Sequence, residues 1–469
     1  MYRTSKGRTA AVALLSAAML MAMGACTGTP TSPATSDTGG SAPAPASSTD
    51  AGTTGACTNT ITKTGIPQVT MWAWYPEFQG VVDLFNSKHD DVQICWQNVG
   101  AGGNEYDKFT TAIQAKSGAP DVIMLEFEVL NSFILQNALV DISQYGANDV
   151  KANYTAGAWK DASSGAGVYA IPVDAGPMGF LVRQDIFDKY KVKVPTTWDE
   201  YAAAAKALKD AGFPGVIGDF ASNNTAGLQA LWNQAGASTF KFDGASPENL
   251  GVAINSDPAK KVTKFWNDLV QQKLVANDDA FTTDWYTKIV NGSYASYIAA
   301  AWGHGYLAGI EGASPEAKWV AVPIPQWKAG DNIQVNHGGS TFAVTTQAKD
   351  PKLATIAAMG IFGDMDSWKI GVEKAALFPT YLPMLTSDYY KNLAYPFFGG
   401  QTINKDVFLP AAQGYSGTTY SPFQTYYYQQ MTKVLADMTA GKVAPDAGLD
   451  NLQKTITDYA TQQGFKLTS

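Results

Sequence analysis

Aromatic side chains lie at positions of this chain where they can contact a ligand instead of a core. Trp74 and Tyr75 follow a short β-rich run, and Trp302 lies within the glycine-rich string AWGHG at 301–305. Open α/β sheets bind their ligands outside the carboxyl ends of the strands. A flat aromatic face there suits the C–H face of a sugar ring, and Asp, Glu, Asn and Gln side chains bond the hydroxyls. The pattern favours a carbohydrate site.

Carboxyl groups in the same regions admit a second chemistry. Glu126 and Asp174 are a pair that a glycoside hydrolase could use, since such enzymes hold two carboxyl groups about 5–5.5 Å or 6.5–9.5 Å apart. The sequence leaves their separation open. Acidic side chains beside tryptophans bond sugar hydroxyls equally well in a receptor, so a lipid-anchored hydrolase is the alternative to a receptor.

Other catalytic chemistry has little support. The three histidines, His89, His304 and His337, form no close pair and no His-Glu-x-x-His motif. The chain has no Gly-x-Ser-x-Gly motif, no Walker-type loop and no Gly-x-Gly-x-x-Gly motif. We therefore expect no metal, no cofactor and no enzymatic activity. His304 is expected as a ligand contact beside Trp302, with a satisfied loop histidine as the alternative.

The N-terminus predicts export and lipidation. Three basic residues within residues 1–9 precede an uncharged, mostly apolar run at 10–22, which is too short to span a membrane. The small residues before Cys26 resemble a bacterial lipoprotein cleavage box, with Met23 in place of the commoner leucine. Removal of residues 1–25 would leave Cys26 to carry acyl chains, and two or more chains anchor stably. The alternative is an ordinary secretory signal with an incidental cysteine.

A tether follows the signal. Residues 26–56 are rich in Thr, Ser, Pro, Gly and Ala, contain no aromatic residue and carry charge only at Asp37 and Asp50. Such a segment cannot bury enough apolar surface to fold. A flexible tether of about 30 residues spans roughly 30 Å, so we expect a folded body held at the extracellular face of the cytoplasmic membrane.

Charge and length bound the folded body. Past the tether about 410 residues remain, which is enough for two domains. The chain has 33 basic and 41 acidic residues, a net charge of −8, and no basic run. This balance disfavours nucleic acid and electrostatic adhesion to anionic lipid. No later segment reaches 18 uninterrupted apolar residues.

Two cysteines remain once Cys26 is assigned to lipidation. Cys57 lies where the tether ends, and Cys95 lies in a predicted strand at 92–96. Exported proteins enter an oxidising compartment, so we expect a disulfide between them, with two free thiols as the alternative.

Short β-rich runs alternate with amphipathic helices from residue 66 onward, which predicts parallel sheets covered by helices. Thr197 and Glu200 form a capping box that opens a helix ending at Gly212. Strands are expected at 68–73, 92–96 and 121–125, and further helices at 78–85, 105–116, 423–440 and 449–463.

Several strings, taken in order, resemble the extracellular solute-binding proteins of ABC sugar importers, in the subgroup of maltose-type oligosaccharide receptors. The resemblance covers nearly everything from about residue 66 to the C-terminus. Its most telling strings are GAPDV at 118–122, ALVDI at 138–142, YAIP at 169–172, GFLVR at 179–183 and PTTW at 195–198.

The resemblance implies an α/β, two-lobed periplasmic-binding-protein-like fold. Each lobe would be a mostly parallel sheet flanked by helices, and crossing hinge segments would let the lobes close on a ligand. The first lobe is expected at 57–175 with 302–336, and the second at 176–301 with 337–469. A loaded receptor of this family, expected as a monomer, docks on the permease subunits of an ABC transporter.

The resemblance also implies a set of ligand-binding residues. Trp302 matches the stacking tryptophan of the family, and Glu126 and Glu128 end a strand where the family places polar contacts. Val129 stands where maltose receptors carry an arginine, so maltose itself is not expected. The full set is Trp74, Tyr75, Glu126, Glu128, Asp174, Trp232, Trp302, His304, Gly339 and Ser340.

The sequence therefore predicts a membrane-anchored extracellular receptor that binds an oligosaccharide between two lobes and delivers it to an ABC import permease. Besides the hydrolase, two alternatives stand: a lipoprotein that adheres to glycans, and a receptor for a non-sugar solute such as a polyamine or an iron complex.

Overall fold

The computed structural model describes residues 55–242, 249–307, 310 and 312–468. The expected signal peptide, the expected lipidation site Cys26 and nearly all of the expected tether lie outside these residues. In the described part of the chain, no helix is both long and apolar enough to cross a bilayer.

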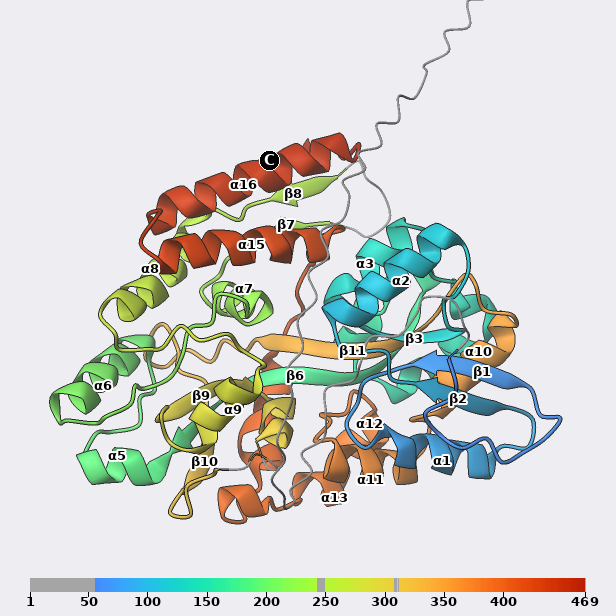
Figure 1. Ribbon diagram of the computed structural model, residues 1–469, viewed down its shortest axis with the longest axis horizontal. Coiled ribbons are helices and arrows are strands. Elements are labelled where there is room, and N and C mark those ends of the chain that lie inside the picture. The colour runs from blue at the N-terminus through green and yellow to red at the C-terminus, as the bar shows by residue number, and fades with distance from the viewer. Residues whose placement is uncertain (1–54, 243–248, 308–309, 311, 469) are drawn as a thin grey trace, which may run out of the picture. The chain divides into compact units, whose positions relative to one another are not determined.

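A seven-stranded sheet organises the described chain (Figure 1). Its order is β10-β6-β11-β3-β1-β2, and β9 pairs with β6 as well. The strands are β1 (Gln68–Trp72), β2 (Gln93–Gln97), β3 (Val122–Glu126), β6 (Ala170–Arg183), β9 (Ser296–Ala300), β10 (Trp319–Pro323) and β11 (Asn336–Val344).

Strand direction changes across this sheet. β1 runs parallel to both β2 and β3, and the helices between these strands supply the crossovers that parallel pairing requires. β11 is antiparallel to β3 and to β6, and β6 is antiparallel to β9 and β10. Within this sheet, the parallel pairing that the sequence predicts is therefore confined to β1, β2 and β3.

β6 joins two halves of the molecule. Its first half pairs with β11, and its second half lies between β9 and β10. The pairing of β6 with β11 shifts register between Asn336 and Thr341. In Figure 1 these two strands run side by side from the region of β9 and β10 to β3. We call the elements around β1–β3 the first lobe and those around β9 and β10 the second lobe.

Helices flank the sheet in both lobes. In the first lobe α1 and α11 contact each other, and α10 packs on β1, β3 and β11. The first-lobe helices are α1 (Phe78–Lys88), α2 (Gly103–Ala115), α3 (Phe127–Leu135), α10 (Pro351–Gly360) and α11 (Met365–Lys374). The second lobe has α5 (Gln184–Tyr190), α6 (Trp198–Asp210), α7 (Thr225–Gln234), α8 (Asp257–Gln271), α9 (Thr283–Val290), α15 (Gln424–Thr439) and α16 (Pro445–Gln462).

Short elements complete the described chain. A three-stranded sheet of order β12-β8-β7 lies beside α16, and β4 and β5 form a hairpin. They are β4 (Ser163–Ser164), β5 (Gly167–Val168), β7 (Phe240–Lys241), β8 (Leu250–Val252), β12 (Leu467–Thr468), α4 (Ala156–Asp161), α12 (Leu382–Leu385), α13 (Asp388–Lys391), α14 (Leu409–Gly414), the 3-10 turns η1 (Ile142–Tyr145), η2 (Ala147–Asn153), η3 (Ala301–Tyr306) and η4 (Pro396–Phe398), and the π-turn η5 (Asn404–Phe408).

The strand pairing and the core clusters bear on the expected lobe limits of the C-terminal segments, which stay a prediction. Residues 302–336 are expected in the first lobe: Trp319 and Ala321 pack in the same core as the residues of β1–β3, whereas β10 pairs with the second half of β6, and Ile324 and Val335 pack in the second core. Residues 337–469 were assigned to the second lobe, yet β11 pairs with β3 and α10 packs on it. β11 therefore pairs with both β3 and β6, so this segment of the chain extends across the two lobes.

Local predictions agree with the structure where the signal is strong. The apolar residues of α1 are buried at helical spacing, at Phe78, Val81, Val82 and Phe85. Both hydrogen bonds of the capping box at Thr197 are present at the start of α6. The disulfide between Cys57 and Cys95 is confirmed, and it fixes the first described residues to β2.

Candidate ligand-binding site

A cavity of about 670 Å³ lies where the two lobes meet. Its walls come from the loop after β1, from α2, β3 and α3 on one side, and from the start of α7, the start of α9, η3 and α15 on the other. Binding sites for small ligands have volumes of about 300–1,000 Å³, so the cavity is large enough for a small oligosaccharide.

Eight of the ten residues expected at the site line this cavity, although they are spread over most of the chain. Gly339 is among them, with a φ of 110°, where a Cβ would stand 2.8 Å from the Asp174 carbonyl oxygen. Only glycine fits so close to the neighbouring strand. The eight are Trp74, Tyr75, Glu126, Glu128, Asp174, Trp302, Gly339 and Ser340.

Asp174 forms the polar floor of the cavity where β6 meets β11. Its carboxylate accepts hydrogen bonds from the Tyr75 hydroxyl at 3.2 Å and from the Ser340 backbone N–H at 3.1 Å, and the Ser340 hydroxyl also donates to it. The side chain is only 5% exposed, and this burial raises its pKa to about 6. Tyr75 is buried as well, so it positions Asp174 and offers no ring face.

Glu126 and Glu128 enter the cavity from the junction of β3 and α3. Glu126 ends β3, and its Oε2 accepts a hydrogen bond from the Tyr106 hydroxyl at 2.9 Å. Glu128 lies in the first turn of α3 and accepts one from the Tyr428 hydroxyl of α15 at 3.0 Å. Burial raises the pKa of Glu126 to about 7 and that of Glu128 well above its ordinary value.

The bond between Glu128 and Tyr428 joins the two lobes across the cavity. The Gln424 backbone N–H of α15 also donates to the Ser132 hydroxyl of α3 at 3.2 Å. Both contacts link α3 of the first lobe to α15 of the second. They tie the lobes together beside the ligand space.

Aromatic rings form the opposite wall. Trp302 lies in η3, directly after β9, and its indole N–H donates to the His337 carbonyl oxygen at 3.0 Å. Tyr306 and Phe281 flank it at ring-centre distances of 5.9 Å and 6.5 Å. Trp74 lies across the cavity on the loop after β1, edge-on to Tyr106. Aromatic side chains from both the loop after β1 and η3 therefore line the cavity together with its carboxyl groups.

Two expected site residues lie elsewhere. Trp232 is fully buried in the second-lobe core, where its indole N–H donates to the Thr263 hydroxyl at 2.9 Å. His304 is buried beside Tyr395, and its Nδ1 bonds to the Ala301 carbonyl oxygen at 2.7 Å. Both side chains face a core, so the structure places neither of them at the cavity.

The sequence did not predict the other lining residues. Four of them share one face of α15, at the spacing i, i+3, i+4 and i+7. A polar helix face usually meets solvent, so this spacing does not by itself indicate a ligand site. The start of α7 and the loop before α9 supply the others. The main ones are Asn223, Asn224, Phe281, Tyr286, Tyr306, His337, Thr425, Tyr428, Gln429 and Thr432.

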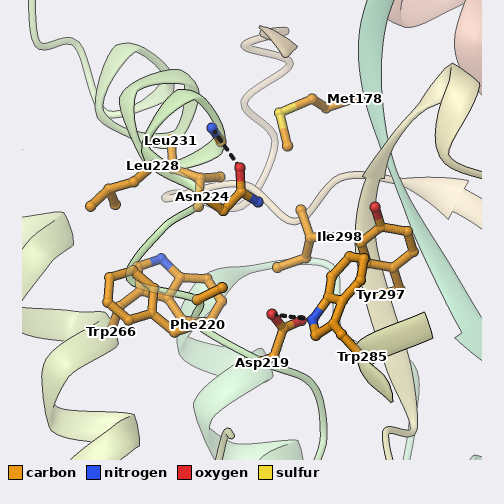
Figure 2. Close-up of a pocket in the computed structure, with 12 residues that line it drawn as sticks. Met178, Asp219, Phe220, Asn224, Leu228, Leu231, Trp266, Trp285, Tyr297 and Ile298 are labelled. Carbon is orange, nitrogen blue, oxygen red and sulfur yellow. Dashed lines mark hydrogen bonds between the residues drawn. The ribbon is translucent and has the colours of Figure 1, made fainter. Parts of the chain in front are cut away.

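A second, smaller cavity of about 40 Å³ adjoins the first and shares Asn224 with it (Figure 2). Asp219 lies at its base and accepts a hydrogen bond from the Trp285 indole at 2.9 Å. Asn224 caps α7 by accepting from the Gly227 N–H. A space of this size suits one or two water molecules and no sugar ring. Among the described residues, no three His, Cys, Asp or Glu side chains are grouped to hold a metal ion.

The family model for bacterial extracellular solute-binding proteins matches residues 73–358, which include β2, β3, β6, β9–β11 and most of the cavity. The chain belongs to this family. The members of this family are extracellular proteins that bind solutes.

Relatives and solved structures agree with this membership and with the two-lobed fold. The lactose-binding protein of Rhizobium radiobacter is 23% identical over 362 residues, covering 72% of this chain and 80% of that protein. An ABC transporter-associated binding protein from B. animalis subsp. lactis Bl-04, solved with β-1,6-galactobiose, has a TM-score of 0.77 and 27% identity, covering 86% of this chain and all of that one. The galacto-N-biose/lacto-N-biose I-binding protein of Bifidobacterium longum has a TM-score of 0.75 and 22% identity, covering 87% of this chain and all of that one.

Proposed function

We propose that this protein is an extracellular receptor that captures an oligosaccharide in the cavity between its lobes and delivers it to an ABC importer. The observation that carries the proposal is the pairing of aromatic rings with carboxyl acceptors around one space of about 670 Å³. Rings such as Trp302 suit sugar C–H faces, and Glu126 and Asp174 can accept hydroxyl protons. The sugars bound by the relatives, lactose and β-1,6-galactobiose, support a short oligosaccharide.

Capture would use the crossing strands as a hinge. β6 and β11 pass between the lobes, and the bond between Glu128 and Tyr428 joins α3 to α15 beside the ligand space. A ligand that contacts both walls favours the closed arrangement, and the closed, loaded receptor is the form that the permease would recognise. Family membership and the aromatic wall support this reading over a hydrolase or an adhesion lipoprotein.

Anchoring would come from Cys26. The apolar run at 10–22, the small residues before Cys26 and the tether at 26–56 support a lipid-anchored receptor at the extracellular face of the membrane. We also propose that the receptor acts as a monomer. Mass spectrometry of the N-terminal peptide would test acylation at Cys26, and an unmodified N-terminus would remove the anchor.

A thermal-shift screen tests the binding function. The purified protein is heated with a panel of neutral oligosaccharides, beginning with lactose, β-1,6-galactobiose and lacto-N-biose, and with polyamines and iron chelates as controls. A ligand bound only by the folded state raises stability by RT ln(1 + [L]/Kd), about 2.7 kcal/mol at a hundredfold excess over Kd. A shift with an intact sugar supports the receptor.

Other outcomes of the screen would redirect the assignment. Cleavage of the sugar during incubation would indicate a hydrolase. A shift with a polyamine or an iron chelate alone would make the protein a receptor for a non-sugar solute. No shift with any member of the panel would overturn the carbohydrate assignment and favour adhesion.

A further inference from the structure

The charges around the cavity are unbalanced. Four acidic side chains line it, Asp107, Glu126, Glu128 and Asp174, and none of its described lining residues is a lysine or an arginine. The nearest candidate for a cation is His337, but burial lowers its pKa to about 4, so its imidazole is uncharged at neutral pH. The cavity therefore presents negative charge without a counter-charge.

Three of these carboxyl groups accept hydrogen bonds from neutral partners, Glu126 from the Tyr106 hydroxyl, and the other two are buried as well. Glu128 is 7% exposed and Asp174 is 5% exposed. Their hydrogen-bond donors are the hydroxyls of Tyr428 and Tyr75 and the hydroxyl and N–H of Ser340. These donors satisfy some lone pairs but bring no positive charge, and buried carboxylates without a cation are costly.

The three carboxyl groups also repel one another. Glu126 raises the pKa of Glu128, and Asp174 raises the pKa of Glu126, in addition to the larger effect of burial on both. The hydroxyls of a neutral sugar can donate hydrogen bonds to such carboxylates, but they leave the repulsion in place. A positive charge on the ligand removes both the repulsion and the cost of burial.

The arginine of the described chain is committed elsewhere. Arg183 is the sole arginine after residue 8. It is buried in the second lobe, forms a two-point ion pair with Asp185 and does not line the cavity. The described residues also hold no group suited to a metal ion.

The aromatic wall points in the same direction as the charges. Trp74, Trp302 and Tyr306 line the space that the carboxyl groups share. The face of an aromatic ring attracts a cation within about 6 Å by about 0.5–2 kcal/mol. We propose that the physiological ligand is an amino sugar: an oligosaccharide with at least one protonated amine that lies among Glu126, Glu128 and Asp174. This inference rests on the proposed carbohydrate function.

Matched sugars test the inference by calorimetry on the purified protein. Cellotriose, the chitosan trisaccharide and the fully N-acetylated chitin trisaccharide share a β-1,4 backbone and carry a hydroxyl, an amine or an acetamide at C2. Lactose, free-amine lactosamine and N-acetyllactosamine form the corresponding galactose-containing series. In a series that binds, we expect the amine to bind at least tenfold more tightly than the hydroxyl and acetamide compounds at neutral pH.

Variants connect the preference to the carboxyl groups. Glu128→Gln keeps the shape and an acceptor for Tyr428 but removes a carboxyl group that a bound amine can hold in its charged form, so the ratio of amine to hydroxyl affinity should fall at least fivefold. Glu126→Gln should act in the same way and serves if the first variant does not fold. Glu316→Gln removes an equal charge from an exposed position, and the ratio should stay within twofold.

The outcomes separate this inference from the function on which it rests. A neutral sugar that binds as tightly as its amine, or more tightly, would overturn the inference and leave the receptor function intact. An amine preference that survives both carboxyl variants would also overturn it. If spermidine binds and no sugar does, the proposed function and the amino-sugar inference both fail.

Discussion

Replacement of Glu126 by glutamine should make the protein more resistant to unfolding at high pH. Burial and the neighbouring Asp174 raise the pKa of Glu126 from 4.5 to about 7. Below pH 4.5 its carboxyl group is protonated in both the folded and the unfolded state. Between pH 4.5 and 7 the unfolded chain releases this proton while the folded protein keeps it, so rising pH favours unfolding.

The size of the effect follows from the two pKa values. Between the two pKa values, each rise of one pH unit lowers the free energy of unfolding by about 1.4 kcal/mol. The total loss is therefore at most about 3 kcal/mol. Glu126 is partly exposed and titrates together with Glu128, so we expect about 2 kcal/mol. Glutamine has no proton to lose and still accepts the hydrogen bond of Tyr106. The variant should therefore gain about 2 kcal/mol over the wild type between pH 4.5 and pH 8.

Urea unfolding at half-unit pH steps measures this difference. Other buried acids lower the stability of both proteins as the pH rises, and subtraction of the two curves removes their contribution. Glu316→Gln is the matched control, because its side chain is exposed and its curve should run parallel to the wild type. If the Glu126→Gln curve also runs parallel to the wild type, Glu126 is ionised in the folded protein and the reasoning is wrong.

Three further changes test other parts of the structure. Trp302→Ala should raise the Kd of a bound sugar at least fivefold, about 1 kcal/mol, and an unchanged Kd in calorimetry would remove this ring from the site. A Cβ on Gly176 would stand 1.9 Å from the His337 carbonyl oxygen and push β6 away from β11. Gly176→Ala should therefore lower the free energy of unfolding in urea by about 2 kcal/mol. A loss below about 0.5 kcal/mol would contradict the close approach of the two strands. Cys57→Ser removes the disulfide to Cys95, which joins residues 38 positions apart, and should lower the free energy of unfolding by about 3 kcal/mol. Reduction of the wild-type protein should reproduce this loss. No change in either sample would show that the disulfide does not restrain the unfolded chain.

Local patterns in the sequence predict several elements of both lobes well. The helical spacing of apolar residues in α1 and the buried run of β3 appear in the structure close to the expected limits. The capping box at Thr197 opens α6. These signals are reliable because they depend on neighbours along the chain, such as a side chain that satisfies the free N–H groups of its own helix start. The disulfide followed from the number of cysteines and the export signal.

The site was only partly predictable. Acidic and aromatic residues at the ends of strands, such as Glu126 and Trp302, line the cavity because the carboxyl ends of β3 and β9, which run in opposite directions, both reach the region where β6 and β11 cross between the lobes. Trp232 and His304 carry the same kind of side chain but face cores. The residue type is the same for a tryptophan in a helix and for one in a loop, so only the packing in the tertiary structure shows which of them lines the cavity.

The sequence by itself determined the family, the strands and helices of the N-terminal part, the disulfide and the choice of acidic and aromatic groups. The tertiary structure alone decided which lobe β10, β11 and α10 join, and it brought Tyr428 of α15 to Glu128 of α3. The physical reason is distance along the chain. A contact between residues 300 positions apart depends on strand pairing and lobe packing, and no local spacing records it.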